Sequence, residues 1–346
     1  MSGSPGLPEG RRARPFPDRN QLLAYVASMY YEGRRSQADI AAEVGLSRSM
    51  ISRLLDEAHR RGLVEIRIQW PTAPVPDLGR QLAQVFGLRR ACVIDASGLP
   101  YPAMLRQLGA AADAELHSLL RDGMTISVAW GSALWETVRA VRPGSWEGIE
   151  VVQCIGALGS AHSPSDGPAI AQLLAQKLGG RYRYLHAPLV VDSEDVCRGL
   201  LADRTIAETL DLAGRADVAL VGIGTVDPER SSLRRAGYLS EEAVGELRHR
   251  GAVGDICARY FDAAGVPIGA PIDRRVIGIG LDVLREVPTV LGIAGGAVKA
   301  ESILGALRGR YVDILVTDRE AAELLLSGAS EEMSRAVLVT EPEAPT

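Results

Sequence analysis

The sequence predicts an α/β protein in which a small N-terminal winged helix-turn-helix domain precedes a larger domain. The larger domain is expected to contain a mostly parallel sheet with helices on both faces. Three observations predict this. Two capped amphipathic helices meet at a glycine at position 45. A proline-rich stretch at residues 71–77 then interrupts every periodic pattern. From residue 78 onward, strand-like runs that are apolar throughout alternate with amphipathic helices, as in a parallel sheet that is buried on both faces.

The helix-turn-helix is predicted between Ser36 and Arg61. Ser36 stands at a helix N-cap with Asp39 as its capping-box partner, and Gly45 ends that helix. Ser47 caps the second helix, which would enter the major groove of DNA. Any capped helical hairpin shares this apolar spacing, but the polar outer face favours DNA binding. Contacts to bases or phosphates are expected from Ser36, Gln37, Ser47, Arg48, Ser49, Ser52 and Arg53.

The domain boundaries follow from composition. We expect a disordered tail at 1–17, a winged domain at 18–70, a linker at 71–77, the larger domain at 78–328 and a C-terminal tail at 329–346. A first helix at 19–32 and a strand at 63–70 would complete the winged domain. In the larger domain, strands are expected at 91–95, 125–130, 149–155, 182–188, 217–224, 254–262, 276–280, 289–294 and 312–317. The strand at 254–262 would turn at Ala-Ala-Gly, residues 263–265. Helices are expected at 78–86, 104–120, 132–141, 168–178, 196–212 (a pair), 241–250, 298–307 and 319–325.

Composition limits the class of protein. Hydrophobic residues make up 47 % and charged residues 23 %, and no apolar run is long enough to span a membrane or form a signal core. We therefore expect a cytoplasmic protein without a membrane partner. The cysteines form no CxxC pair and the five histidines lack metal-ligand spacing, which favours reduced core cysteines and no metal site.

Charge is divided unevenly along the chain. Residues 1–70 carry a net charge of +3 and the remainder carries −8, so the basic excess lies with the helix-turn-helix. Because +3 is modest, one copy would bind DNA weakly. A homo-oligomer, a dimer or a larger assembly, is therefore expected.

Four loops that follow expected strands are rich in Gly, Ser and Thr. Ligands of parallel sheets bind at the carboxyl ends of the strands, near helix N-termini. A single glycine after a strand more often serves the turn, but four such loops at one edge favour a ligand that bears a phosphate. The candidate residues are Gly131, Ser132, Gln153, Gly156, Gly222, Gly224, Thr225, Asp227, Ser231, Gly295, Gly296 and Lys299. The GxGxxG and GxxxxGK[ST] patterns are absent, so neither NAD nor ATP is expected, and no other cofactor is expected either.

Lys299 and Asp255 give further information about the ligand. The chain has 38 basic residues, but only Lys177 and Lys299 are lysines. A lysine directly after a Gly-Gly turn suggests a need for a compact positive charge, although an ordinary surface lysine is the alternative. Asp255 lies beside glycines, where it would either bind sugar hydroxyls or close a turn.

Several sequence blocks carry a resemblance to a known family. They include VAWGSAL (128–134), VGIGTVDP (221–228), GAVGDICARYFD (251–262) and AGGAVKAESILGALRG (294–309). From residue 19 to about residue 326 the chain resembles the SorC family of sugar-binding transcriptional regulators. The resemblance implies a domain similar to ribose-5-phosphate isomerase and glucosamine-6-phosphate deaminase. It also implies a sugar or sugar-phosphate effector, a homotetramer of paired dimers, and operator double-stranded DNA as a partner.

The resemblance also implies roles for individual residues. The phosphate would contact Gly131, Ser132, the Gly295–Gly296 turn and Lys299. Asp227 and Asp255 would contact sugar hydroxyls.

Three functions compete. The first is a DNA-binding regulator, not an enzyme, whose operator binding is controlled by the effector. The alternative is a sugar-phosphate isomerase or deaminase with a DNA-binding appendage, for which Asp227, Asp255 and Glu301 are the acid–base candidates. No catalytic His or carboxylate pair stands out for that role. A structural DNA-binding protein without a ligand would leave the larger domain unexplained.

Overall fold

The computed structural model describes residues 18–64, 71–159 and 165–340, with only the backbone for residues 330–340. The chain divides into two compact units, Met1–Gln69 and Trp70–Thr346. The predicted N-terminal tail and the predicted wing strand from residue 65 onward lie outside the described residues.

The described part of the first unit, residues 18–64, forms three helices around a small apolar core. They are α1 (Arg19–Tyr31), α2 (Gln37–Val44) and α3 (Arg48–Arg60). Ser36 Oγ accepts the Asp39 N–H (3.2 Å) and donates to the Asp39 carboxylate (2.7 Å). Gly45 ends α2 with a φ of 73°, a left-handed conformation that glycine adopts without steric cost. Ser47 Oγ then accepts the Met50 N–H (3.2 Å) at the start of α3. The predicted pair of helices and their caps are thus present.

The second unit is built on a seven-stranded sheet in which every neighbouring pair of strands is parallel. The strand order is β1-β9-β8-β5-β2-β3-β4. The strands are β1 (Arg90–Ile94), β2 (Thr125–Val128), β3 (Glu150–Gln153), β4 (Arg181–Arg183), β5 (Val218–Gly222), β8 (Val290–Ile293) and β9 (Ile314–Asp318). Except for β4, they are largely buried, because helices cover both faces of the sheet. The predicted fold class is confirmed.

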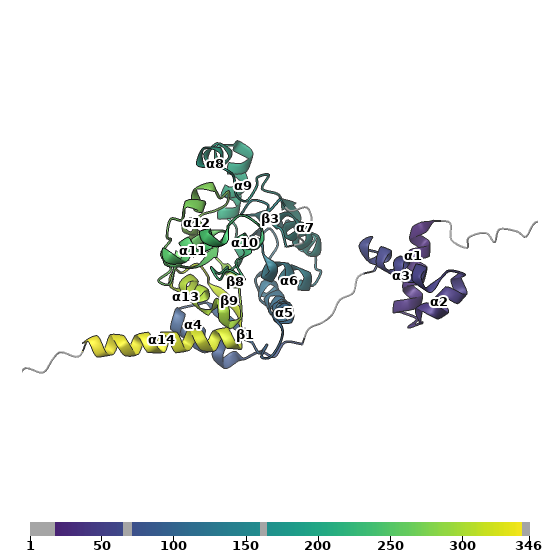
Figure 1. Ribbon diagram of the computed structural model, residues 1–346, viewed down its shortest axis with the longest axis horizontal. Helices are drawn as coiled ribbons and strands as arrows, with labels where there is room; N and C mark the ends of the chain where they lie inside the picture. The colour runs from purple at the N-terminus through teal and green to yellow at the C-terminus, as the bar shows by residue number, and fades with distance from the viewer. Residues whose placement is uncertain (1–17, 65–70, 160–164, 341–346) are drawn as a thin grey trace, which may run out of the picture. The chain divides into compact units, whose positions relative to one another are not determined.

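Helices form a layer on each face of this sheet. The first layer consists of α5 (Tyr101–Leu119), α6 (Ser132–Ala140) and α7 (Gly167–Leu178). The other face is covered by α4 (Pro76–Phe86), α9 (Arg204–Gly214) and α14 (Arg319–Thr340). Figure 1 shows α5, α6 and α7 on one side of the strands and α4, α13 and α14 on the other. The remaining helices are α8 (Glu194–Leu201), α10 (Ser232–Arg235), α11 (Glu241–His249), α12 (Leu281–Glu286), α13 (Ala300–Arg308), and the 3₁₀ turns η1 (Pro271–Arg275) and η2 (Ala297–Lys299).

A separate antiparallel hairpin lies outside the main sheet. Its strands are β6 (Ala252–Ile256) and β7 (Arg259–Asp262), and α13 packs against it. The prediction of one strand at 254–262 is wrong because the chain turns at Cys257 and Ala258, with φ values of 52° and 57°. Two-residue turns of this kind usually contain Asn or Gly, so the sequence carries no local signal for it. The hairpin brings Asp255 beside the end of β5.

Residues 73–75 differ from the expected linker. The Val75 N–H donates to the Val93 carbonyl (2.8 Å), and the Asp95 N–H donates to the Ala73 carbonyl (2.7 Å). Pro74 lies between these bonded residues, at the open edge of β1, where its missing N–H has no cost. Prolines therefore do not prevent this segment from pairing, and α4 begins directly after it.

Two other expectations from the sequence, one about a strand and one about the C-terminal tail, differ from the structure. Residues 276–280 form no strand, and only Val276 and Gly278 make isolated bridges. The expected C-terminal tail at 329–346 is helical as far as Thr340, because no proline interrupts the helix formers after residue 326. Cys154, Cys197 and Cys257 are buried and Cys92 is half-buried, all as free thiols. Among the described helices, none is both long and apolar enough to cross a lipid bilayer.

Candidate functional site

The carboxyl ends of β2, β5, β8 and β9 form one edge of the sheet, where the predicted glycine-rich loops begin. Several predicted residues are half-buried here, at the boundary between core and solvent. They are Gly131, Ser132, Gly222, Gly224, Asp227, Asp255, Gly296 and Lys299. Half-buried polar groups at this edge are available to a ligand and partly shielded from water.

Lys299 and Asp255 form the charged centre of this edge. The Lys299 ammonium donates to the Ile223 carbonyl, just after β5 (2.6 Å). Burial lowers the pKa of Lys299 to about 8, while Asp255 acts in the opposite direction. Burial likewise raises the pKa of Asp255 to about 6, against the effect of Lys299. Both groups therefore bear desolvated charge, which is typical of binding and catalytic sites.

Gly224 allows the hairpin to reach this edge. A Cβ at position 224 would lie 1.9 Å from Oδ1 of Asp255, so only glycine leaves room for the carboxylate. The Gly224 N–H donates to the Asp255 backbone carbonyl (2.8 Å). The glycine after β5 thus serves the placement of Asp255.

Three cations converge on this edge, together with a tyrosine and a serine. The guanidinium carbon of Arg230 lies 4.8 Å from the centre of the Tyr101 ring. Burial raises the pKa of Tyr101, against the effect of Arg230 and Arg235, and the Ser132 hydroxyl is within hydrogen-bonding reach of the tyrosine. Arg235 and Arg230 also contribute to the lowered pKa of Lys299. The three positively charged groups therefore lie near one another at this edge, with Arg230 beside the Tyr101 ring.

The loop that carries the two arginines is shaped by three predicted residues. Oδ1 of Asp227 accepts N–H groups of the following turn, including that of Arg230 (3.0 Å). Thr225 Oγ1 accepts the Asp227 N–H (3.2 Å), and Ser231 caps α10. Thr225 and Ser231 are buried. These residues therefore fix the backbone of the loop in which Arg230 lies.

Gln153 and Gly156 lie beneath the surface of the site. The Gln153 amide nitrogen donates to the Ile155 carbonyl, and the amide oxygen accepts the Leu185 N–H, both at 3.2 Å. A Cβ on Gly156 would lie 2.3 Å from the Pro188 carbonyl oxygen. The Gln153 amide is therefore bonded to backbone groups, and Gly156 is packed against backbone. Neither residue is expected to contact the ligand.

The backbone donors expected for an anion are already bonded. The Gly131 N–H donates to the Ser165 carbonyl (3.1 Å), and the Gly296 N–H donates to Asp318 Oδ1 (2.7 Å). Gly295 is buried, and a Cβ there would lie 2.8 Å from the same Asp318 oxygen. In this structure an anion would therefore be held by side chains rather than by these two N–H groups.

Four residues of this site were not predicted: Tyr101, Arg230, Arg235 and Asp318. The two arginines had a usable signal, because they lie in a loop that follows a predicted strand and is rich in Gly, Ser and Thr. Tyr101 had none, since only the fold brings the start of α5 to this edge. Asp318 resembles an ordinary polar residue at a strand end.

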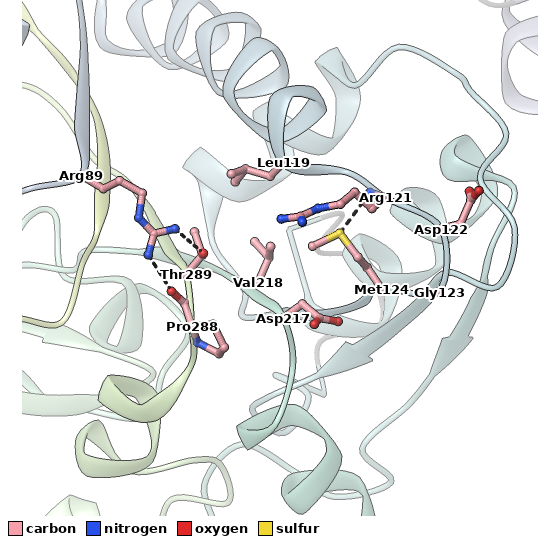
Figure 2. A pocket seen from close by; sticks show the side chains of 10 residues that line it. All are labelled: Arg89, Leu119, Arg121, Asp122, Gly123, Met124, Asp217, Val218, Pro288 and Thr289. Carbon is pink, nitrogen blue, oxygen red and sulfur yellow. Dashed lines mark hydrogen bonds between the residues drawn. The ribbon is translucent and has the colours of Figure 1, made fainter.

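A depression of about 320 Å³ lies at the opposite, N-terminal edge of the sheet (Figure 2). It is lined by Arg89, Leu119, Arg121, Asp122, Gly123, Met124, Asp217, Val218, Pro288 and Thr289. Arg89 donates to Thr289 Oγ1 (2.7 Å) and to the Pro288 carbonyl (2.9 Å), and Asp217 accepts the Thr125 N–H (2.8 Å). These groups hold the strand ends together, which favours the carboxyl edge as the ligand site.

The outward face of α3 carries the residues predicted to contact DNA directly, which are Arg48, Ser49, Ser52 and Arg53. Among residues 18–64, neither Arg48 nor Arg53 forms an ion pair. By contrast, Arg19 and Arg61 both pair with Glu57 (2.6 and 2.7 Å). Within residues 18–64, the guanidinium groups of Arg48 and Arg53 are thus not committed to an intramolecular ion pair.

The other predicted DNA contacts lie at helix starts. Ser36 and Ser47 are exposed caps, and the Ser47 hydroxyl also lies 3.0 Å from the Ser49 hydroxyl. Gln37 is the half-buried first residue of α2. Helix N-termini are frequent phosphate contacts in protein–DNA complexes.

Comparison with known proteins identifies the family to which this chain belongs. The family model of a sugar-binding domain, Sugar-bind, matches residues 74–327. The crystal structure of the full-length sorbitol operon regulator SorC from Klebsiella pneumoniae superposes with a TM-score of 0.67, at 32 % identity over 89 % of this chain and 99 % of that chain. The chain belongs to the SorC family of sugar-binding transcriptional regulators.

Sequence similarity to other SorC-family proteins extends over both units. The chain is 34 % identical over 310 residues to the deoxyribonucleoside regulator of Bacillus subtilis (strain 168), covering 90 % of this chain and 98 % of that protein. It is 33 % identical over 308 residues to the sorbitol operon regulator of Klebsiella pneumoniae, covering 88 % and 98 %. As a SorC-family protein, the chain is a DNA-binding transcriptional regulator that responds to a sugar.

Proposed function

We propose that the effector of this SorC-family regulator is a phosphorylated sugar, bound at the carboxyl edge of the seven-stranded sheet. The observation that carries the proposal is that Lys299, Arg230 and Arg235 lie near one another at this edge, with the Arg230 guanidinium 4.8 Å from the centre of the Tyr101 ring. Hydrogen bonds between guanidinium or ammonium groups and phosphate oxygens are among the strongest in proteins. Three cations at one edge favour a phosphate over a neutral sugar.

The remaining groups suit the sugar. Asp255 is half-buried and can accept hydrogen bonds from hydroxyl groups. The Ser132 and Tyr101 hydroxyls can each donate one and accept others. We place the phosphate toward Lys299 and the two arginines, and the sugar hydroxyls toward Asp255.

Isothermal titration calorimetry with a panel of sugars and their phosphates tests this assignment. Arg230→Ala and Arg235→Ala should each weaken binding of the phosphorylated sugar by about tenfold or more, since a hydrogen bond to a charged group contributes about 1.5–3 kcal/mol. The matched control is Arg234→Ala, because this side chain turns away to the Pro228 carbonyl and to Glu241 (both 2.9 Å). Equal loss in the control, or tighter binding of neutral sugars than of phosphates, would overturn the proposal.

We infer that operator binding depends on the outward face of α3. Each lost base contact should cost about 1–3 kcal/mol, so Arg53→Ala and Arg48→Ala should weaken specific binding strongly. The operator sequence would first be selected from a random pool of duplex DNA, and the variants would then be compared in gel-shift titrations. Arg34→Ala removes the same charge from an exposed turn between α1 and α2 and serves as the control. Identical affinities for Arg34→Ala and Arg53→Ala would contradict the assignment.

We further propose that the regulator acts as a homo-oligomer, a dimer or a tetramer. The support is the net charge of only +3 on residues 1–70, which is too small for tight binding by one copy. Light scattering after gel filtration should give two or four times the mass of the chain. A monomer at micromolar concentration would contradict it.

We propose no catalytic step, because the relatives described above carry the names of regulators. Turnover of ribose-5-phosphate or glucosamine-6-phosphate by the purified protein would overturn this part of the proposal.

A further inference from the structure

Asp318, the last residue of β9, is a carboxylate in a buried position. Its exposed fraction is 5 %. The neighbouring Arg319 does not neutralise it, because Arg319 donates to Asp95 instead (2.9 Å). Among the described residues, no lysine, arginine or histidine forms an ion pair with Asp318. Burying an unpaired carboxylate is costly, so the fold retains this charge for a specific contact.

That contact is with the Gly295–Gly296 turn. Oδ1 of Asp318 accepts the Gly296 N–H at 2.7 Å, the short distance typical of a charge-assisted hydrogen bond. Gly295 must lack a side chain for the carboxylate to fit, since its Cβ would lie 2.8 Å from the same oxygen. Gly296 has a φ of 90°, a conformation that favours glycine.

The Gly295–Gly296 turn positions Lys299. The Lys299 N–H donates to the Gly296 carbonyl (2.9 Å), which closes η2. From that position the Lys299 ammonium reaches the Ile223 carbonyl (2.6 Å) at the end of β5. A short chain of hydrogen bonds thus connects the buried carboxylate of β9 to the segment that carries the Lys299 ammonium group.

We propose that Asp318 is a positioning residue of the effector site, which fixes the Gly295–Gly296 turn and thereby holds Lys299 where it meets the phosphate. This inference rests on the proposed function. The same carboxylate occupies the Gly296 N–H, so this N–H is not available to an anion.

The variants Asp318→Ala and Asp318→Asn separate this role from a general effect on stability. Asparagine retains an acceptor oxygen and the shape of the side chain, whereas alanine removes both. Asp95→Ala is the matched control, because Asp95 also lies at the carboxyl edge but contacts Arg319 and Ser97 rather than the turn. The unfolding midpoint, followed by tryptophan fluorescence, shows whether each variant is folded.

The probes are inorganic phosphate and ribose-5-phosphate, titrated by calorimetry into the full chain. At pH 7, Asp318→Ala should raise the dissociation constants at least tenfold, while Asp318→Asn and Asp95→Ala should change them less than threefold. The pH dependence gives a second readout that a purely structural residue would not change. If Lys299 is released into water, its pKa returns toward the ordinary lysine value, so the loss of affinity at high pH should move upward by at least one pH unit.

Each outcome supports or contradicts the positioning role of Asp318. Unchanged affinity in Asp318→Ala, equal loss in Asp95→Ala, or equal loss in Asp318→Asn would overturn the positioning role. The positioning role would also be overturned if affinity were lost at the same alkaline pH in Asp318→Ala as in the wild type. If the wild-type protein binds neither probe nor any other sugar phosphate, the proposed function fails, and the inference fails with it. If the wild-type protein binds a probe and Asp318→Ala binds it equally well, the proposed function stands and only the positioning role of Asp318 is overturned.

Discussion

Replacing Gly109 by alanine should force α5 and α6 apart. A Cβ at this position would lie 2.5 Å from the Glu136 carbonyl oxygen and 2.8 Å from the Thr137 nitrogen. Both are backbone atoms of α6, so no side-chain rotation relieves the clash and the helix itself has to move. Because Ser132 is the first residue of α6, the displacement would also reach the effector site.

The expected change in stability is a difference between two effects. Alanine is about 1 kcal/mol more favourable than glycine in a helix interior. Overpacking a core contact costs about 1–3 kcal/mol, and a contact with rigid backbone falls in the upper part of that range. We therefore expect Gly109→Ala to lower the free energy of unfolding by about 1–2 kcal/mol.

Urea unfolding followed by tryptophan fluorescence measures this change, because all four tryptophans lie within Trp70–Thr346. Gly245→Ala in α11 is the matched control, since no atom lies within 4 Å of the added Cβ. That variant should gain about 0.5–1 kcal/mol from helix propensity alone. A Gly109→Ala protein as stable as the wild type, beside a stabilised Gly245→Ala protein, would refute the argument from helix contact.

Other expectations concern pH, a helix cap and a buried amide. Effector affinity should be highest between about pH 6 and pH 8: above this range Lys299 (pKa about 8) loses its positive charge, and below it Asp255 (pKa about 6) becomes protonated. Calorimetry from pH 5 to pH 9 should give a bell-shaped profile, and a flat alkaline limb would contradict the role of Lys299. Ser47→Ala should cost the first unit about 1 kcal/mol of stability because α3 loses its cap, whereas Ser49→Ala should change it by less than about 0.5 kcal/mol in thermal unfolding followed by circular dichroism. Gln153→Leu should cost about 2–4 kcal/mol in urea unfolding, because two buried backbone groups lose their partners, and a loss below about 1 kcal/mol would show that they find others.

The helix-turn-helix could be predicted because its signals are local. Ser36 and Ser47 cap helices through contacts three residues away, and Gly45 supplies the left-handed turn between them. The parallel sheet was equally accessible, since strands covered on both faces must be apolar along their whole length. The hairpin was not, because Cys257 and Ala258 adopt positive φ values without the Gly or Asn that normally marks such a turn.

The effector site was predictable only in part. Lys299 and Asp255 lie beside glycines that mark the carboxyl edge, so the sequence pointed to them directly. Arg230 and Tyr101 are far apart in the chain and meet only because α5 and the loop after β5 both begin at the same edge. Asp318 acts through its burial, and burial of a strand-end carboxylate depends on the tertiary packing around it.

Lys299 also differs from the arginines of this chain as a chemical group. An amine that is partly neutral near pH 8 is a nucleophile, whereas a guanidinium remains protonated. The other lysine, Lys177, is held by hydrogen bonds to the carbonyl oxygens of Arg139 and Val141 (2.5 and 2.9 Å). An acylating reagent at pH 8 should therefore modify Lys299 before Lys177, and a bound effector should protect it. Of the two lysines, Lys299 is therefore the one at which we expect an acylating reporter to mark the domain matched by the sugar-binding family model.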